Sequence, residues 1–272
     1  MTSNLLETDT EELFRDALES ATSDVYLIDP SVRVLRAAVQ LGATDGSDLP
    51  TVNVVADSRL LKDVMDDFLI GADAADLIQD GELTLRVLEE EVDNTLLVSE
   101  SAMYAIVTAT DTVGALAAEA DDFLADAYET YADLWERSSE FNLRTPPLSE
   151  IRETMDEQIG EEVREDFDTV LDSLDMARGK GDGIDEVTIS LLVAAKNEAL
   201  LYDISKWGED VGIASKATFS RSKTRLEDMG IIDTEKVPID VGRPRLRLKL
   251  GHDDLAGVTS ENLAAKSMEI IY

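Results

Sequence analysis

The sequence predicts an α/β domain with a mainly parallel sheet, then a helical connector, then a small C-terminal domain of helices and a hairpin. Two observations predict this fold class. Short apolar runs alternate with amphipathic helical patterns over residues 1–118, as they do in βαβ units. Residues 178–183 then bring three glycines close together, which neither a helix nor a strand favours. A domain boundary is expected at these glycines.

Within the α/β domain, the spacing of apolar residues separates helices from strands. Apolar residues three to four apart predict helices at 10–21, 31–41, 58–69 and 72–79, with Ser58 as the expected N-cap residue of the third. Short apolar runs predict strands at 25–29, 51–57, 83–88, 95–98 and 103–109. The last two strands are close enough in the chain to form an antiparallel hairpin at one edge of the sheet.

Two long helices are expected in the connector, residues 119–178. The first carries an aromatic stripe, and the second starts near Ser149 and repeats an apolar residue every four positions as far as Phe167. Two interpretations stay open: both helices pack on their own domain, or they form the seam of a homodimer, because aromatic side chains anchor interfaces well. The residues expected at that seam are Phe123, Tyr128, Tyr131 and Trp135.

The chain carries 24 Lys and Arg against 59 Asp and Glu, a net charge of −35 over 272 residues. The apolar periodicity excludes a disordered acidic chain, so the charge lies on a folded surface. Carboxylates spread along the chain in this way keep a protein hydrated in molar salt, where the Debye length is about 3 Å and self-repulsion is screened. The charge therefore predicts a protein of a halophilic organism that accumulates salt.

Several classes of function are excluded by composition. The chain has no cysteine and one histidine, His252, which excludes disulfide frameworks, zinc ribbons, thiol nucleophiles and sites that need paired imidazoles. We expect no catalytic residue, no cofactor and no bound metal, and we expect His252 to be a solvated surface residue. The chain has no apolar run long enough to span a membrane and an acidic N-terminus, so a cytoplasmic protein without membrane contact is expected.

One segment departs from the acidic balance. Residues 204–250 hold ten basic residues against seven acidic ones, a net +3, whereas the remaining 225 residues hold 14 basic against 52 acidic. Helices are expected at 185–201, 202–210 and from a cap at Ser215 to Gly230. The third has Phe219, the stem of Lys223, Leu226 and Met229 on its buried side. Its outward face is then small, hydroxylic and cationic, as a helix in a major groove requires.

A hairpin follows this helix. Ile231 to Val237 predicts one strand, and Arg245 to Leu250, which alternates cations with leucines, predicts the other. Three helices and a basic hairpin form a winged helix-turn-helix over residues 184–251, followed by a C-terminal extension over 252–272. Double-stranded DNA is the expected partner. The residues expected to contact it are Ser215, Lys216, Ala217, Thr218, Ser220, Arg221, Thr224, Arg225, Arg243 and Arg245.

A ligand site is also expected in the α/β domain, because ligands of open sheets collect beyond the carboxyl ends of parallel strands. This rule points to Asp29, Asp57, Ser58 and Arg59, which could hold the hydroxyl and phosphate groups of a small metabolite. The competing interpretation is that the Asp and Ser residues only cap helices. Two other functions stay open: an enzyme acting on sugar phosphates, and a winged-helix adaptor that binds another regulator.

The run from Ala214 to Ile232, followed by Gly242-Arg243-Pro244, is similar to prokaryotic winged-helix regulators. The whole chain, including Val25-Tyr-Leu-Ile-Asp-Pro30, resembles the haloarchaeal TbsP family of TrmB-suppressor transcriptional regulators. That resemblance implies a transcription factor of central carbon metabolism, with a glyceraldehyde-3-phosphate dehydrogenase gene as an expected target. The N-terminal half also resembles the phospholipase D-like sensor region of TrmB-type regulators, in reversed domain order and without the catalytic boxes.

Overall fold

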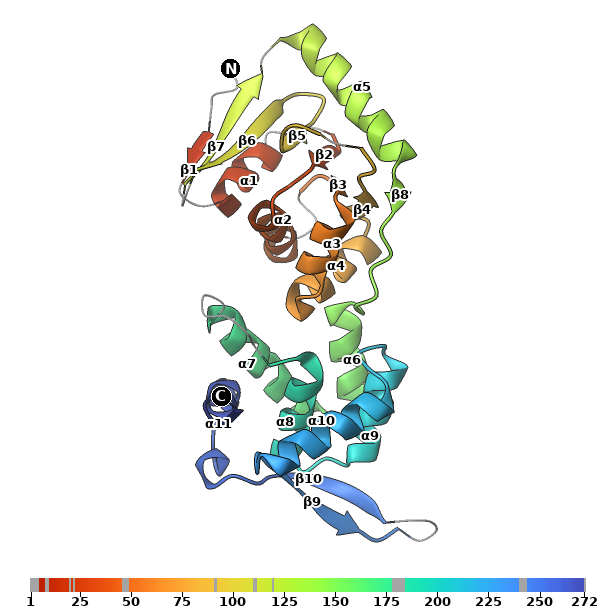
Figure 1. The fold of residues 1–272 in the computed structure, drawn as a ribbon, viewed down its shortest axis with the longest axis vertical. Helices are drawn as coiled ribbons and strands as arrows, with labels where there is room; N and C mark the ends of the chain where they lie inside the picture. Colours follow the sequence, from red (N-terminus) through yellow and green to blue (C-terminus); the bar gives the residue numbers. More distant parts are fainter. Residues whose placement is uncertain are drawn as a thin grey trace. The chain divides into compact units, whose positions relative to one another are not determined.

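The computed structural model describes residues 5–7, 10–19, 21, 23–45, 49–90, 92–109, 112–118, 120–177, 184–239 and 244–271 (Figure 1). It divides the chain into two compact units, Met1–Pro147 and Leu148–Tyr272. The predicted connector, residues 119–178, is therefore wrong as a separate unit. Its first helix packs on the sheet of the N-terminal unit and its second half packs with the C-terminal helices. The glycines at 178–183 lie outside the described residues.

The N-terminal unit alternates strands and helices as the sequence predicts. Its elements are β1 (Leu5–Glu7), α1 (Thr10–Glu19), β2 (Val25–Ile28), α2 (Val32–Asp45), β3 (Val52–Ala56), α3 (Ser58–Met65), α4 (Phe68–Gln79), β4 (Leu83–Val87), β5 (Leu96–Val98), β6 (Met103–Ala109), β7 (Thr112–Ala118), α5 (Asp121–Arg137) and β8 (Ser139–Glu140).

These strands form one mixed sheet in the order β1-β7-β6-β5-β2-β3-β4-β8. Parallel pairing joins β2 to β3 and β3 to β4, which are the strands of the predicted βαβ units. The predicted hairpin is present as the antiparallel pair β5–β6. The antiparallel part is larger than the sequence indicates, because β7, β1 and β8 extend the sheet. Strand β7 (TVGALAA) was missed because alanine and glycine have weak strand propensity.

The sheet is covered on both faces, and the alternation of side chains along each strand shows which helices lie on which side. Leu27 and Val54 belong to a core with residues of α1 to α4, whereas Ile28 and Val55 belong to a second core with residues of α5. Figure 1 shows this arrangement, with α5 running along the sheet on the side away from α1 and α2. The unit therefore has three layers.

The aromatic stripe of α5 faces this sheet. Tyr128, Tyr131 and Trp135 are half-buried against the second core, and Trp135 Nε1 donates a hydrogen bond to Thr84 Oγ1 at 3.0 Å. The Arg86 guanidinium stacks 3.7 Å from the Trp135 ring centroid and donates to its carbonyl oxygen at 2.7 Å. These three aromatic side chains therefore pack within their own unit, as the first of the two interpretations holds. They do not form an outward-facing seam.

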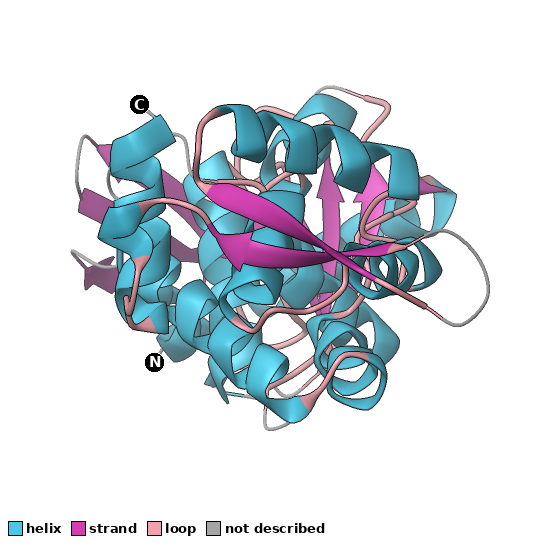
Figure 2. Cartoon of the chain, turned by 90° about the horizontal axis from the view of Figure 1, so that it is seen from below, coloured by secondary structure: helices cyan, strands magenta, loops and turns pink. Residues whose placement is uncertain are grey.

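The C-terminal unit is helical apart from one hairpin. Its elements are α6 (Leu148–Gln158), α7 (Glu161–Ala177), α8 (Glu186–Lys196), α9 (Leu201–Asp210), α10 (Lys216–Asp228), β9 (Ile232–Val237), β10 (Arg245–Leu250), the 3-10 helix η2 (Asp253–Leu255) and α11 (Ser260–Ile271). Figure 2 shows the β9–β10 hairpin crossing in front of helices. The single helix expected from Ser149 is wrong, because it breaks into α6 and α7 at Gly160, whose φ is +139°.

Helix α11 is part of this unit, so the predicted C-terminal extension is not an appendage. It packs on α7 and α8. Asp166 of α7 joins the three helices: it accepts hydrogen bonds from Lys196 Nζ at 2.6 Å and Asn197 Nδ2 at 2.7 Å, and another from the Ser260 hydroxyl. Burial opposes ionisation of Asp166, but these donors outweigh it and lower the pKa of its carboxyl group. His252 also has a structural role, because its Nδ1 accepts a hydrogen bond from the Asp254 amide and caps η2.

Among the helices of the described residues, none has both the length and the hydropathy that a membrane crossing needs.

The packing of α9 on α10 depends on one glycine. Gly208 is buried in α9, and a Cβ atom added there would lie 2.4 Å from the Phe219 ring, which has no exposed surface. Trp207, the neighbour of Gly208 in the chain, is also buried, so an added Cβ atom enters a region that is already packed. The sequence alone does not show this contact.

We expect Gly208→Ala to destabilise the C-terminal unit by about 1–3 kcal/mol, because it forces extra volume into a packed core. Chemical denaturation followed by Trp207 fluorescence measures this, in a Trp135→Phe background that leaves one tryptophan in the chain. Lys206→Ala, on the exposed side of the same helix, is the control and should change stability by about 0.5 kcal/mol or less. Equal effects of the two substitutions would contradict the close-packing account.

Candidate DNA-binding surface

Helices α9 and α10 form a helix-turn-helix. The turn between them contains Gly212, whose φ of +91° favours glycine. Helix α10 then begins after Ser215, whose hydroxyl accepts a hydrogen bond from the Thr218 amide, as an N-cap does. It ends before Gly230, whose φ is +71°. The predicted cap and stop of this helix are confirmed.

Helix α10 presents the face that the sequence predicts. Phe219 and Leu226 are buried, and the Lys223 side chain is only 12% exposed. Met229 is the exception among residues predicted to face inward, because it is exposed in the last turn. The outward side chains are Ser215, Ala217, Ser220, Arg221, Thr224 and Arg225, which are exposed, and Lys216 and Thr218, which are half-buried.

Two cations on this face are free of carboxylate partners in the described part of the chain. Arg221 donates only to the Thr218 hydroxyl, at 3.2 Å, and Arg225 lies one turn further along the helix. The residues between and beside them, such as Ser220 and Thr224, are small and hydroxylic. A guanidinium group presented in this way can donate two hydrogen bonds to the edge of a guanine.

Lys216 differs from these arginines because it is already paired. Its ammonium group forms an ion pair with Glu209 of α9, and its backbone amide donates to the same carboxylate at 3.3 Å. The hydrogen bond between the two side chains lowers the pKa of Glu209 and raises the pKa of Lys216, so both are charged at neutral pH. The first cation of α10 is therefore neutralised within the domain.

Three cations of the wing, the β9–β10 hairpin, are paired in the same way, whereas Lys236 of β9 is exposed and has no carboxylate partner in the described residues. The Arg245 guanidinium lies 3.1 Å from Asp203 and stacks on the Tyr202 ring with its centre 4.3 Å from the ring centroid. Arg247 lies 3.9 Å from Glu198, and Lys249 lies 2.6 Å from Glu235. Arg245, predicted to contact DNA, thus also fastens β10 to α9. The other predicted wing residue, Arg243, lies outside the described residues.

The predicted ligand residues of the N-terminal unit gather at the carboxyl ends of β2 and β3. Asp57 is an N-cap, accepting from the amides of Arg59 at 2.8 Å and Leu60 at 3.4 Å. Ser58, predicted as the cap, is instead the first residue of α3. Asp29 has a positive φ of 44°, and burial, with a smaller contribution from the charge of Asp57, raises the pKa of its carboxyl group.

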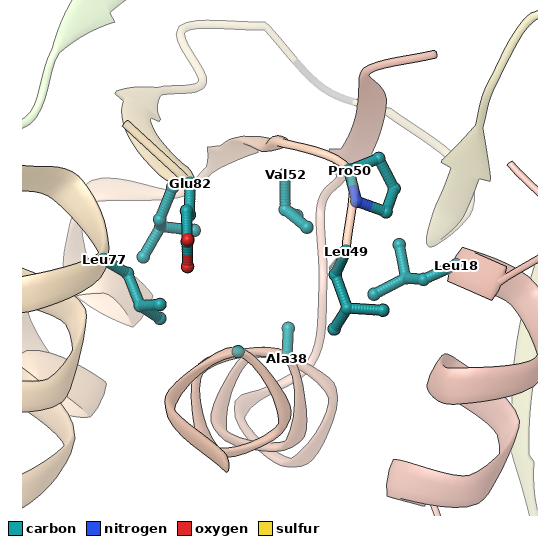
Figure 3. A pocket seen from close by; sticks show the side chains of 9 residues that line it. Leu18, Ala38, Leu49, Pro50, Val52, Leu77 and Glu82 are labelled. Carbon is teal, nitrogen blue, oxygen red and sulfur yellow. The ribbon is translucent and has the colours of Figure 1, made fainter. Parts of the chain in front are cut away.

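A small pocket lies at the opposite ends of these strands. Its lining includes Leu18, Ala38, Pro50, Val52 and Leu77, and the Glu82 carboxylate reaches into the space between them (Figure 3). The enclosed space is about 20 Å³, which suits a water molecule and is too small for a metabolite. Within the described residues, no group of three acidic or histidine side chains converges as metal ligands do.

A helix-turn-helix with an exposed cationic second helix and a following hairpin defines a winged helix-turn-helix DNA-binding protein. Two family models cover the chain. One, described as "Transcriptional regulator TbsP-like, N-terminal", matches residues 2–146, and the other, "Transcriptional regulator TbsP-like, C-terminal HTH domain", matches residues 147–268. The chain belongs to the family of TbsP-like transcriptional regulators, and it is therefore a DNA-binding regulator. The two matches meet where the structure divides the chain.

Comparison with solved structures gives weaker similarities. The archaeal chromatin protein TrmBL2, whose structure is described as showing a novel mode of DNA binding, matches with a TM-score of 0.35 and 15% identity over 52% of this chain and 54% of that one, so the match spans about half of TrmBL2. Nuc from Salmonella typhimurium, a phospholipase D family member, matches with a TM-score of 0.35 and 11% identity over 52% and 99%. NucT from Helicobacter pylori matches with a TM-score of 0.31 and 9% identity, over 51% of this chain and 99% of that one. Comparison with curated proteins found no match.

The pairing of Lys216 generates a prediction about DNA affinity. Glu209→Gln keeps an acceptor for the Lys216 amide but frees the ammonium group for a phosphate. We expect tighter DNA binding at low salt and a plot of log affinity against log salt that is steeper by about 0.9, the increment for one phosphate contact. Fluorescence anisotropy over a salt series measures both.

Asp228→Asn removes one exposed carboxylate from the far end of α10 and is the control. It has the same change in net charge but frees no partner. If the two variants raise affinity equally, the effect is one of overall charge and Lys216 does not reach the DNA.

Proposed function

We propose that this protein is a sequence-specific transcriptional regulator of a halophilic archaeon that binds double-stranded DNA as a homodimer. In this proposal α10 enters the major groove, and the wing lies against the neighbouring backbone. The family and the helix-turn-helix support a DNA-binding regulator. The arrangement of charges on α10 and the wing supports the more specific statements.

The observation that carries the proposal is the unpaired state of Arg221 and Arg225. Five other cations of the helix and hairpin are paired with carboxylates, namely Lys216, Lys223, Arg245, Arg247 and Lys249. Arg221 and Arg225 have no such partner in the described residues, and neither has Lys236 of the hairpin. The two unpaired guanidinium groups therefore lie on the outward face of α10. The small side chains of this face allow it to approach base edges. In this proposal, two of the three unpaired cations of the described helix and hairpin lie on the face that reads sequence.

The salt of the cell gives this arrangement a physical reason. A charge of −35 keeps the protein dispersed in molar salt, and the same salt removes most of the affinity that arises when phosphate binding releases counterions. A regulator in that environment has to obtain its affinity from direct contacts with bases, which salt screens less. Two arginines per monomer, doubled in a homodimer on a palindromic site, provide such contacts.

The target and the effector are parts of the proposal that rest on other observations. The TbsP resemblance supports control of central carbon metabolism in the cytoplasm, including a glyceraldehyde-3-phosphate dehydrogenase gene. For a metabolite effector, Asp29 and Arg59 remain available at the carboxyl ends of the parallel strands, because the Asp29 carboxylate caps no helix and Arg59 is exposed. Asp57 would contribute less, since its carboxylate already caps α3.

We expect Arg221→Ala to weaken binding to the preferred site by about 1–3 kcal/mol and to relax base preference at one position of each half-site. Arg243→Ala should instead weaken all sequences alike and reduce the salt slope by about 0.9 for each phosphate that the guanidinium group neutralises. Its effect should shrink near native ionic strength, whereas the Arg221 effect should persist. Binding-site selection with both variants at two salt concentrations measures these differences.

Lys266→Ala, on the exposed face of α11, is the matched removal of one cation away from α10. It should leave the selected motif and its affinity unchanged. If Arg221→Ala leaves the motif unchanged as well, α10 does not read sequence in the way proposed. Absence of any selected motif from the unmodified protein would favour the adaptor, in which the winged helix binds another regulator.

A further inference from the structure

Among the described residues of the N-terminal unit, no helix covers the outer part of strands β6 and β7 on one face of the sheet. Along β6, Tyr104 and Ile106 point into the core beneath α1 and α2, so Met103, Ala105 and Val107 point to the opposite face. That is the face on which α5 packs, and its main contacts there are with β2, β3 and β5. Met103 and Ala105 pack against the second core, whereas Val107 and Leu116 further out are exposed.

The most exposed large apolar side chains of the described residues lie on these two strands and in the first turn of the helix that follows them. Leu116 of β7 is 57% exposed, Val107 of β6 is 51% exposed, and Phe123 in the first turn of α5 is 50% exposed. Leu116 and Val107 lie on adjacent strands of the same face, and α5 follows directly on β7. Clusters of this kind mark interaction sites, because single-chain soluble proteins seldom expose contiguous apolar surface.

The same strands are almost free of charge. Residues 101–118 include a single charged residue, Asp111, in a chain that is 31% charged. Elsewhere the surface of this protein is acidic, as hydration in molar salt requires. Hydration therefore does not explain why the surface of these strands lacks charge. Since two copies of a chain with a charge of −35 repel each other, a surface on which they meet has to be free of carboxylates. The neutral face therefore suits a second copy of this chain.

The register of β6 and β7 makes this face complementary to itself. Ala105 lies opposite Leu116, and Gly114 lies opposite Val107, so each row across the two strands has one large and one small residue. The large residues alternate between the strands. When two such faces meet about a two-fold axis, the large side chains of each can fill the space over the small residues of the other, as in aligned sheet packing.

We propose that the outer face of β6 and β7, together with Phe123, is the surface through which two copies of this chain form a homodimer. The inference rests on the dimeric regulator proposed above and names the surface that makes it. It replaces the seam predicted along α5, of which Phe123 alone remains. Because screening removes the repulsion between the two chains, the dimer is stronger in molar salt than in dilute buffer.

The test compares substitutions that place a carboxylate on this face with one that places it elsewhere. Leu116→Glu and Val107→Glu each introduce two carboxylates into a two-fold interface. Val32→Glu is the control, because Val32 is 46% exposed in the same unit but lies at the start of α2. Sedimentation equilibrium of the full chain in about 2 M KCl measures the association, and circular dichroism confirms that each variant is folded.

The unmodified protein and Val32→Glu should sediment at twice the 29.8 kDa of one chain. Leu116→Glu and Val107→Glu should raise the dimer dissociation constant by about 100-fold or more, since each substitution removes an apolar anchor from both copies. A folded Leu116→Glu variant that remains dimeric would overturn the inference, and so would a monomeric unmodified protein. Lowering KCl should weaken the dimer of the unmodified protein, and a dimer that is stronger at low salt would also contradict it.

Cross-linking gives an independent measurement, because the chain has no cysteine of its own. Leu116→Cys should give a covalent dimer with a short thiol-reactive cross-linker, whereas Val32→Cys should not. These measurements need no DNA. A negative result would therefore not bear on the proposal that Arg221 reads sequence, which has a separate test. Conversely, a dimer through this face that selects no DNA motif would leave the inference standing and overturn the proposed regulator.

Discussion

The excess of negative charge is the constraint on which the other features of this protein depend. A chain with a charge of −35 has to approach DNA, which is itself a polyanion, and can do so only through a segment whose balance is reversed. The reversal is small, a net +3 over residues 204–250, and most of its cations form ion pairs within the same domain. Lys216, Arg245 and Lys249 are all paired with carboxylates of the same domain. In the described part of α10 and the wing, only Arg221, Arg225 and Lys236 have no carboxylate partner.

This pairing is better explained by specificity than by stability. Exposed ion pairs contribute about 0–1 kcal/mol each, and molar salt lowers even that. What the pairs do change is the field that DNA meets, since a wing whose cations are mostly paired attracts any sequence less strongly. In the proposed regulator, Arg221 and Arg225 then contact bases against weaker non-specific binding, and the ratio of specific to non-specific affinity rises. The wing itself is held by apolar contacts as well, since Leu248 is buried and its amide donates to the Ala199 carbonyl at 2.9 Å.

The sequence predicted the winged helix more closely than the α/β domain, and the reason is local chemistry. A hydroxyl cap at Ser215, a glycine at 230 and the alternation from Arg245 to Leu250 each determine structure through neighbouring residues. Long-range contacts left no such signal. The apolar ring of Trp135 is compatible with either interpretation of its helix. Only its contacts with Thr84 and Arg86 show which face of α5 meets the sheet. Strand β7 was missed for the same reason, because its pairing partner and not its composition makes it a strand.

The separation of the two proposed surfaces follows from the same constraint. A basic surface and a neutral apolar one have opposite requirements, since the first needs unpaired cations in water and the second excludes charge. Placing them in different compact units lets each unit keep its own core: Phe219 and Trp207 support α10, while Tyr104 and Ile106 support the β6–β7 pair from beneath. A substitution that removes charge or apolar surface from one unit should therefore leave the other folded. Under the two proposals, DNA reading and self-association can then change separately, because neither surface is built from the core of the other.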